Sequence, residues 1–191
     1  MKNFLKRYLI KIPNYIAVFY CEQRQTLLIQ GPVRKKLLTL QIQLEVLKDE
    51  KLIKVKDQPF VNVSNKEKKT MKSLRGTTVA LIKQAFLEVS SSVCKKLNLK
   101  GVGYKVFPVE NTSINLIHLK LGYSHSIYLK IPENLRVHCY KSDKIFLFGN
   151  DYNLVSSTSA LIRSCKIPEP YKGKGISYSN EIIKLKEGKK V

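Results

Sequence analysis

The chain has 191 residues, with 35 Lys and Arg against 14 Asp and Glu, so its formal net charge is +21 at pH 7. Such an excess is atypical of an ordinary cytosolic enzyme and favours a polyanionic partner, of which nucleic acid is the first candidate. Hydrophobic residues make up 43% of the chain, enough for a packed core, which excludes a disordered basic tail. No apolar run approaches the roughly 20 residues of a membrane helix, so we expect no membrane partner.

The first half of the chain begins with segments whose composition predicts strands at 15–20, 26–30, 36–47 and 51–56. The polar, Lys-rich residues 57–70 are typical of a loop. From Ser73 to Lys96 the apolar residues approximate the i, i+3, i+4 spacing of an amphipathic helix. This pattern predicts one long helix that ends before Gly101.

The second half repeats this organisation, with strands expected at 113–121, 126–131, 134–140 and 144–149. The alternation of Ile127, Leu129 and Ile131 with polar neighbours indicates a half-buried antiparallel strand. A short helix is predicted from Leu154 to Ser164. The last 24 residues form an extended segment with a basic end.

An internal repeat relates the two halves. Ile10–Pro13 (IKIP) is followed by an apolar strand and Gly31, and Leu129–Pro132 (LKIP) by an apolar strand and Gly149. Downstream, the segments TVALIK and TSALIR occupy residues 78–83 and 158–163. We therefore match Gly31 with Gly149 and expect Leu81 and Leu161 to be buried in equivalent helices.

The predicted fold is α+β, with two tandem duplicated domains, each an antiparallel or mixed sheet packed against one helix. We place the first repeat at 1–98, the second at 99–170, and a basic extension of the second domain at 171–191.

Motifs for catalysis or cofactors are missing. Gly101-Val102-Gly103 lacks the third glycine of a dinucleotide fingerprint, and no close acidic pair or nucleophile elbow occurs. The cysteines at 21, 94, 139 and 165 have no zinc-ligand spacing, and we interpret them as small, reduced core residues. We expect no enzyme, no cofactor, no metal site and no small-molecule substrate.

The segment 163–176 (RSCKIPEPYKGKGI) has a composition suited to a phosphate backbone. The prolines favour an extended path, the glycines let the main chain approach a sugar-phosphate edge, and the lysines between them supply point charges. Tyr171 adds a stacking face. A solvated basic loop that closes onto the last strand is the alternative. The candidate RNA contacts are Arg163, Lys166, Tyr171, Lys172, Gly173, Lys174 and Gly175, extended by Lys184, Lys186, Lys189 and Lys190.

At this segment the chain resembles the universal large-subunit ribosomal protein number six family, whose second domain ends in a similar Pro-Glu-Pro-Tyr-Lys-Gly-Lys-Gly stretch. Further matching segments are residues 100–105 (KGVGYK), 119–125 (LKLGYSH), 162–163 (IR) and 186–190 (KEGKK). The chain departs from the family pattern in the first domain. Charged residues at 34–36 replace a usual glycine, and Glu88 replaces a glycine of the first helix.

The resemblance implies two duplicated αβ domains and binding to large-subunit ribosomal RNA near the factor-binding region, mainly through the second domain. It also implies neighbouring large-subunit ribosomal proteins as partners. We therefore expect a structural constituent of the large ribosomal subunit. A free RNA-binding or RNA-remodelling module is the alternative, and an enzyme that acts on nucleic acid is the third hypothesis.

The compartment is inferred from composition alone. The bias toward Lys over Arg, together with many Asn and Ile, is typical of AT-rich coding and favours an organellar source. We therefore predict the mitochondrion (ribosome, matrix), with a plastid or a bacterial cytoplasm as the alternatives.

Overall fold

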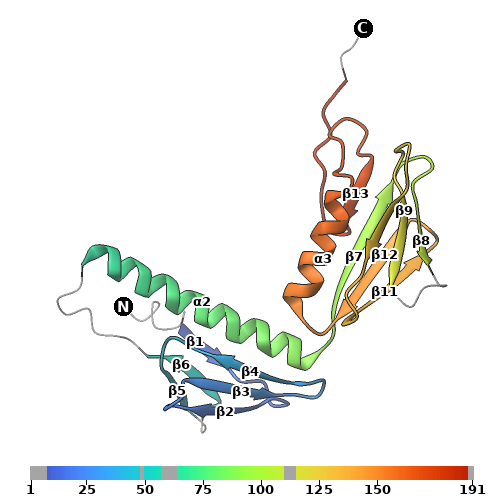
Figure 1. The fold of residues 1–191 in the computed structure, drawn as a ribbon. Coiled ribbons are helices and arrows are strands. Elements are labelled where there is room, and N and C mark those ends of the chain that lie inside the picture. The colour runs from blue at the N-terminus through green and yellow to red at the C-terminus, as the bar shows by residue number, and fades with distance from the viewer. Residues whose placement is uncertain (1–7, 48–49, 57–63, 110–114, 189–191) are drawn as a thin grey trace. The chain divides into compact units, whose positions relative to one another are not determined.

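The computed structural model describes residues 8–47, 50–56, 64–109 and 115–188. The chain forms two compact units, Met1–Ser91 and Ser92–Val191, each built from two antiparallel sheets and one helix (Figure 1). Among the described residues, no helix is long and apolar enough to cross a membrane, and no group of His, Cys, Asp or Glu side chains is placed to hold a metal ion.

The first unit has two sheets, with strand orders β1-β6-β5 and β2-β3-β4, and helix α2. Its core is drawn from both sheets and from α2, because alternate strand residues such as Leu27 and Ile29 point inward. The elements are β1 (Leu9–Lys11), β2 (Ala17–Cys21), β3 (Thr26–Gln30), β4 (Lys35–Thr39), β5 (Leu44–Leu47), β6 (Leu52–Val55) and α2 (Asn65–Ser90).

The second unit has sheets of order β11-β12-β7-β13 and β10-β9-β8, and helix α3 packs against β7, β12 and β13 (Figure 1). Both sheets and α3 contribute side chains to a single core. The elements are β7 (Val93–Lys100), β8 (Lys105–Val109), β9 (Leu116–Lys120), β10 (Ile127–Lys130), β11 (Leu135–Tyr140), β12 (Lys144–Gly149), α3 (Tyr152–Ser164) and β13 (Gly175–Tyr178).

The two units share one topology. In each, the second, third and fourth strands form one sheet, while the sixth strand lies between the first and the fifth in the other. The helix follows the sixth strand in both units, and β13 is an addition to the second. The predicted α+β fold with duplicated domains is confirmed.

The residue matches that suggested the repeat are only partly correct. Gly31 follows the third strand of its unit, whereas Gly149 ends the sixth strand of the other, so the two glycines are not equivalent. The two glycines share one feature, which is that each lies so close to a helix that a side chain would clash with it. A Cβ on Gly31 would lie 2.8 Å from the carbonyl oxygen of Val89, and one on Gly149 would lie 2.8 Å from a methyl group of Val155.

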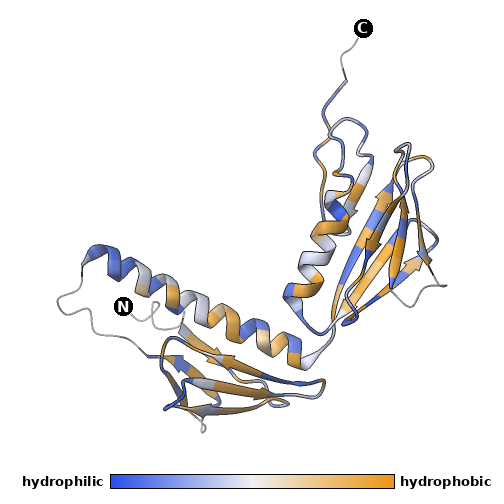
Figure 2. Ribbon diagram, viewed as in Figure 1, coloured by the Kyte–Doolittle hydropathy of each residue, from blue (hydrophilic) through white to orange (hydrophobic). Residues whose placement is uncertain are grey.

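The first helix lies earlier in the chain than predicted. α2 begins at Asn65, within the predicted loop, because Ser64 and Glu67 form a capping box in which each side chain accepts a hydrogen bond from the other residue's backbone N–H. Its first turns are hydrophilic (Figure 2), so no apolar periodicity marks them. The rest of that predicted loop, 57–63, lies outside the described residues.

The predicted helix end was also wrong. Residues 93–100 form β7, in which Leu97 and Leu99 are buried at strand spacing, so the second unit begins at Ser92 and not at residue 99. A segment as short as VCKKLNLK, with few apolar residues, fits helix and strand periodicity alike, and here pairing with β12 and β13 decides for a strand.

The cysteines differ from the expected core residues. Cys21 and Cys94 are exposed, whereas Cys139 and Cys165 are half-buried, and all four are free thiols. Burial raises the pKa of the Cys139 and Cys165 thiols. Both therefore stay protonated and poorly nucleophilic at neutral pH.

The segments 78–83 and 158–163 are equivalent, as predicted. The hydroxyl groups of Thr78 and Thr158 each donate a hydrogen bond of 2.8 Å to the carbonyl oxygen four residues earlier. The expected burial of Leu81 and Leu161 was wrong, because Leu161 is 53% exposed while the next residue, Ile162, is 0% exposed. Neighbouring helix residues point about 100° apart, so only one of the pair faces the core.

This difference predicts a contrast between adjacent substitutions. Ile162→Ala removes fully buried methyl groups and should lower the free energy of unfolding by about 2–5 kcal/mol. Leu161→Ala removes a largely exposed side chain and should cost less than about 1 kcal/mol. Urea denaturation of both variants measures the difference, and similar losses would contradict the assignment of the buried face.

A buried carboxylate links the helix of the first unit to a strand. Glu88 on α2 is 1% exposed, and one of its carboxylate oxygens accepts hydrogen bonds from Arg34 and Lys36. The side-chain amide of Gln84 donates to the other oxygen at 2.9 Å. Two of the three cations at 34–36 thus share the carboxylate of Glu88 inside the unit.

Removing that carboxylate takes away the buried anion that the guanidinium of Arg34 and the ammonium group of Lys36 both contact. We expect Glu88→Ala to lower the free energy of unfolding by about 3–5 kcal/mol. Glu45→Ala is the control, because Glu45 pairs with Lys54 at 3.5 Å on the surface and should cost less than about 1 kcal/mol. Equal effects in thermal unfolding would show that the Glu88 cluster contributes no more than a surface pair.

Candidate RNA-binding surface

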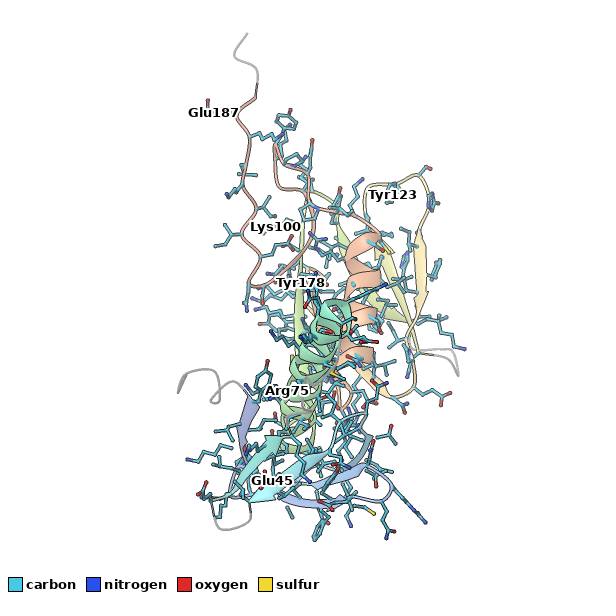
Figure 3. The ribbon with its side chains drawn as sticks, turned by 90° about the vertical axis from the view of Figure 1, so that its left-hand side faces the viewer. Glu45, Arg75, Lys100, Tyr123, Tyr178 and Glu187 are labelled. Carbon is cyan, nitrogen blue, oxygen red and sulfur yellow. The ribbon has the colours of Figure 1, made fainter. Side chains whose placement is uncertain are left out.

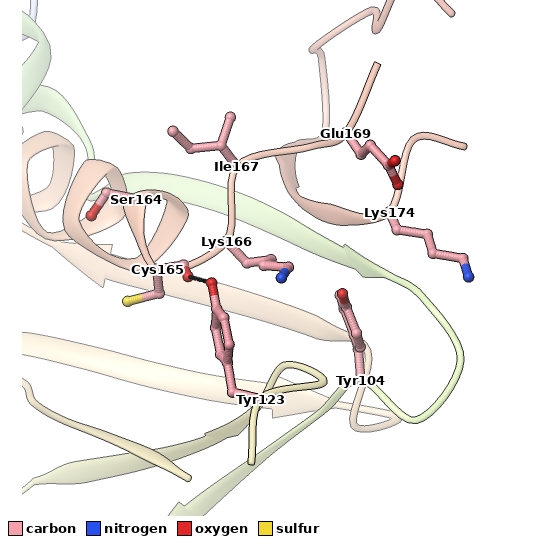
Figure 4. A pocket seen from close by; sticks show the side chains of 8 residues that line it. All are labelled: Tyr104, Tyr123, Ser164, Cys165, Lys166, Ile167, Glu169 and Lys174. Atoms are coloured by element: carbon pink, nitrogen blue, oxygen red, sulfur yellow. Dashed lines mark hydrogen bonds between the residues drawn. The ribbon is translucent and has the colours of Figure 1, made fainter. Parts of the chain in front are cut away.

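Three loops meet at one end of the second unit. They connect β7 to β8, β9 to β10, and α3 to β13, and Tyr123 lies on the second of them (Figure 3). Together the loops surround an open pocket of about 480 Å³ (Figure 4). Its lining residues are Tyr104, Tyr123, Ser164, Cys165, Lys166, Ile167, Glu169 and Lys174.

Tyr123 fastens its loop to the end of α3. Its hydroxyl group donates a hydrogen bond of 3.0 Å to the carbonyl oxygen of Cys165 (Figure 4), and its ring stacks on that of His125 with centroids 5.6 Å apart. The ammonium group of Lys166 lies 4.2 Å from the centroid of the Tyr123 ring. This cation–π contact holds a positive charge at the mouth of the pocket.

Glycines make room for the second tyrosine of the pocket. A Cβ on Gly101 would lie 2.8 Å from the ring of Tyr104, and one on Gly122 would lie 3.0 Å from it. Both glycines have positive φ angles, +154° and +71°, which other residues rarely adopt. Gly101 of the Gly-Val-Gly sequence therefore leaves room for an aromatic ring, whereas a Cβ on Gly103 would meet no atom within 4 Å.

The segment between α3 and β13 is closed by its own backbone. The N–H groups of Glu169 and Gly173 donate hydrogen bonds of 2.9 Å to the carbonyl oxygens of Lys174 and Glu169, respectively. The N–H of Lys186 in the tail donates to the carbonyl oxygen of Pro170 at 2.8 Å. The basic segment is thus a defined loop, which lowers the entropy that its lysines lose on binding.

The predicted glycines act inside the protein. Gly175 has a φ of +148°, and a Cβ there would lie 2.7 Å from Cα of Pro168, so its close approach is to the chain's own backbone. Gly173 is buried with a φ of +68°. The approach of both glycines to a sugar-phosphate edge stays a prediction, and the geometry shows that Gly175 packs closely on the chain's own backbone.

The predicted RNA contacts on the loop and the tail differ in exposure. Tyr171 and Lys172 are exposed at the tip of the loop, whereas Lys166 and Lys174 are half-buried and line the pocket. Lys184 and Lys186 are exposed on the tail. Lys189 and Lys190 lie outside the described residues.

Arg163 is bound within the unit. Its guanidinium contacts both carboxylate oxygens of Glu181, with an Nε to Oε2 distance of 3.0 Å, and Glu181 also accepts the N–H of Tyr178 at 3.1 Å. The hydrogen bond with Glu181 raises the pKa of Arg163, and the same bond lowers the pKa of Glu181. Arg163 therefore fastens the C-terminal tail to α3.

Sequence reasoning missed three aromatic side chains of this surface. Tyr104, Tyr123 and His125 lie within the matching segments 100–105 and 119–125, but they are far from the C-terminal loop in sequence. The glycines at 101, 103 and 122 near the two tyrosines were the available signal, since glycine lets another group approach the backbone closely.

Comparison with known proteins identifies relatives of the chain. Residues 101–179 match the family model described as ribosomal protein L6. The large ribosomal subunit protein uL6 of Malacoplasma penetrans is 47% identical over 130 residues, 68% of this chain and 68% of the relative. The uL6 of Mesoplasma florum is 42% identical over 137 residues, which cover 72% of this chain and 74% of the relative. The uL6 of Chloroherpeton thalassium is 37% identical over 143 residues, which cover 75% of this chain and 78% of the relative.

The duplicated fold, the basic loop and these relatives define the chain as a protein of a ribosomal family. The chain belongs to the ribosomal protein L6 family, whose curated members named above are called large ribosomal subunit protein uL6. The resemblance seen in the sequence is confirmed.

The pair of Arg163 and Glu181 predicts a pH dependence. Because the pKa of Glu181 is lowered in the folded state, its stabilising contribution is fully present above the unfolded pKa of about 4.3 and is lost as the pH falls through the lower folded value. Glu181→Gln should therefore lower the stability by about 1 kcal/mol at pH 7.

The difference between wild type and Glu181→Gln should shrink as the pH falls below the unfolded pKa and vanish below the lowered folded pKa, where the wild-type carboxyl group is protonated as well. Thermal unfolding at several pH values measures it. A stability difference that does not change with pH would show that the pair contributes nothing through its charge.

Proposed function

We propose that the chain is a structural constituent of the large ribosomal subunit that binds large-subunit ribosomal RNA with the loop end of its second unit. Three relatives at 37% to 47% identity carry the large-subunit name, which supports this role. The family model spans residues 101–179, which include the pocket and the basic loop. Binding near the factor-binding region follows from the family resemblance alone.

The observation that carries the proposal is the hydrogen-bonded loop that holds Tyr171 and Lys172 at its exposed tip beside a pocket lined by Lys166 and Lys174. Lysine ammonium groups on a defined backbone suit phosphate oxygens, and an exposed tyrosine offers a face to a base. These four side chains form the direct contact that we propose.

The remaining predicted residues shape the loop, position the tail or add positive charge. Gly173 and Gly175 give the loop its shape, and Arg163 positions the tail. Lys184 and Lys186 extend the positive surface, and we include Lys189 and Lys190 with them on charge alone. The segment 171–191 thus forms the RNA-binding extension of the second domain in this proposal.

Neighbouring large-subunit proteins complete the proposed set of partners. A free RNA-binding or RNA-remodelling module remains the alternative. That alternative predicts a pool of the chain that is not bound to ribosomes, whereas a subunit component sediments with large subunits. An enzyme has less support, because the family is a structural one and the pocket holds Glu169 as its one carboxylate among the described lining residues.

The compartment is a separate question. The relatives named above are bacterial and lend no support to the mitochondrial location, which rests on amino-acid bias alone. We therefore propose a ribosome of the bacterial type. Fractionation of the source cells, with detection of the chain in each compartment, decides between a bacterial cytoplasm and an organelle.

The salt dependence of binding tests the direct contacts. Each lysine that neutralises a phosphate adds about 0.7–0.9 to the slope of log affinity against log salt. Lys172→Ala and Lys174→Ala should each weaken binding to large-subunit RNA and lower that slope by about 1. Lys83→Ala on the exposed side of α2 removes the same charge and should leave the slope nearly unchanged.

Filter binding at four or more salt concentrations measures these slopes, and sedimentation of large subunits measures incorporation of each variant. If Lys83→Ala lowered the slope as much as Lys172→Ala, binding would depend on net charge and the loop would have no special part. Normal incorporation of a double Lys172 and Lys174 variant would also contradict the proposed site.

A further inference from the structure

The outer face of the sheet β10-β9-β8 carries a row of aromatic rings. Phe107 on β8 pairs in register with His118 on β9, which in turn pairs with Tyr128 on β10. The His118 and Tyr128 rings stack with centroids 4.8 Å apart and planes 12° apart, and the Phe107 ring lies 6.1 Å from that of His118. The three rings thus form a platform across the sheet.

The core of the unit does not need these rings. The opposite face of the sheet supplies the core through Val106, Ile117 and Leu119, each at most 2% exposed. Tyr128 is 61% exposed and Phe107 is 39% exposed. Cross-strand aromatic pairs add modest stability to a sheet, but that gain does not require rings that stay open to solvent.

Positive charges flank the platform. Lys105 and Lys120 face each other directly across β8 and β9, two residues from the row of rings, and both are exposed. Like charges in such a pair destabilise a sheet, so this arrangement favours an anionic partner. Lys130 lies on the other side of the row, and the sequences of these three strands contain no carboxylate.

Rings and lysines also meet on the other sheet of the second unit, where Phe146 and Phe148 stack with centroids 6.3 Å apart, but there the ammonium group of Lys96 lies 5.3 Å from the Phe146 centroid. The equivalent row in the first unit is Phe19, Leu28 and Leu37, which is mainly aliphatic. On the other sheet of the second unit, Tyr140 has the ammonium group of Lys141 at 5.4 Å from its centroid. Among the described residues, no cation–π contact of this kind involves Phe107 or Tyr128.

We propose that this face is a second RNA-binding site, which takes unpaired bases on the rings of Tyr128 and Phe107 and their phosphates on Lys105 and Lys120. Stacking of bases on aromatic side chains in a basic groove is the usual chemistry of single-stranded nucleic-acid binding. The site goes beyond the proposed function, because none of its residues belongs to the C-terminal loop.

The position of the face suits one continuous strand of RNA. Lys105 directly follows Tyr104 of the pocket, and Lys120 precedes the loop that carries Tyr123. An unpaired segment adjoining the RNA at the loop can therefore pass over the platform. The two sites remain separable, since substitutions on the sheet leave Lys172 and Lys174 in place.

The test compares two probes with the full chain: a short fluorescent oligoadenylate, and an oligomer of equal length and charge without bases. Tyr128→Ala should weaken binding of oligoadenylate by about tenfold, the usual effect of one lost base stack, and leave binding of the abasic oligomer unchanged. Tyr128→Phe keeps the ring and should bind both probes as wild type does.

Tyr140→Ala is the matched control, since Tyr140 is 52% exposed on the other sheet of the same unit and should not affect either probe. Phe107→Leu preserves apolar packing while it removes a ring, and it should lose severalfold affinity for oligoadenylate alone. If Tyr128→Ala lowers the melting temperature, so that a binding loss could come from unfolding, Phe107→Leu still tests the proposal.

Three results would overturn the proposal. Equal losses for both probes would show that only charge acts at this face, and an equal loss in Tyr140→Ala would show that the effect is not local. Unchanged RNA binding by Tyr128→Ala and Phe107→Leu, together with failed incorporation into large subunits, would assign the face to a protein partner.

Discussion

The close approach of Gly175 to Pro168 is the constraint on which the candidate RNA-binding surface depends. It brings the end of the basic loop against its beginning, so that Gly175 to Tyr178 can pair with β7 as the fourth strand of the sheet. Ile176 is fully buried in that strand. A flexible basic tail thereby becomes a loop with a fixed backbone, and its lysines are displayed without a large loss of entropy on binding.

Arginine and lysine have different roles at this end of the second unit. The guanidinium of Arg163 uses its planar fork on the carboxylate of Glu181, while the lysines of the loop and the pocket present single point charges. Lysine outnumbers arginine 29 to 6 in the chain. Such a surface suits contact with phosphate and shape, because reading a base edge favours the bidentate fork that arginine provides.

The duplicated units have diverged around one topology. In the first unit, the buried carboxylate of Glu88 and its part-buried cationic partners tie α2 to β4. In the second unit, the outer face of the corresponding sheet carries the rings of His118 and Tyr128 where the first unit has Leu28 and Leu37. The shared fold supplies the scaffold, and surface substitutions decide what each copy does.

Local patterns in the sequence determined the class of protein, the α+β repeat and the basic loop, because charge, strand alternation and the segment at 168–175 are all properties of neighbouring residues. The tertiary structure alone decided that residues 93–100 pair as a strand, that Arg163 meets Glu181, and that Leu161 faces away from the core. The pocket and the aromatic row likewise unite residues from different strands and loops. Such contacts depend on the register in which strands pair and on how the loops turn the chain back. A shift of one residue in register moves every side chain of a strand to the other face of the sheet, and no local pattern specifies that register.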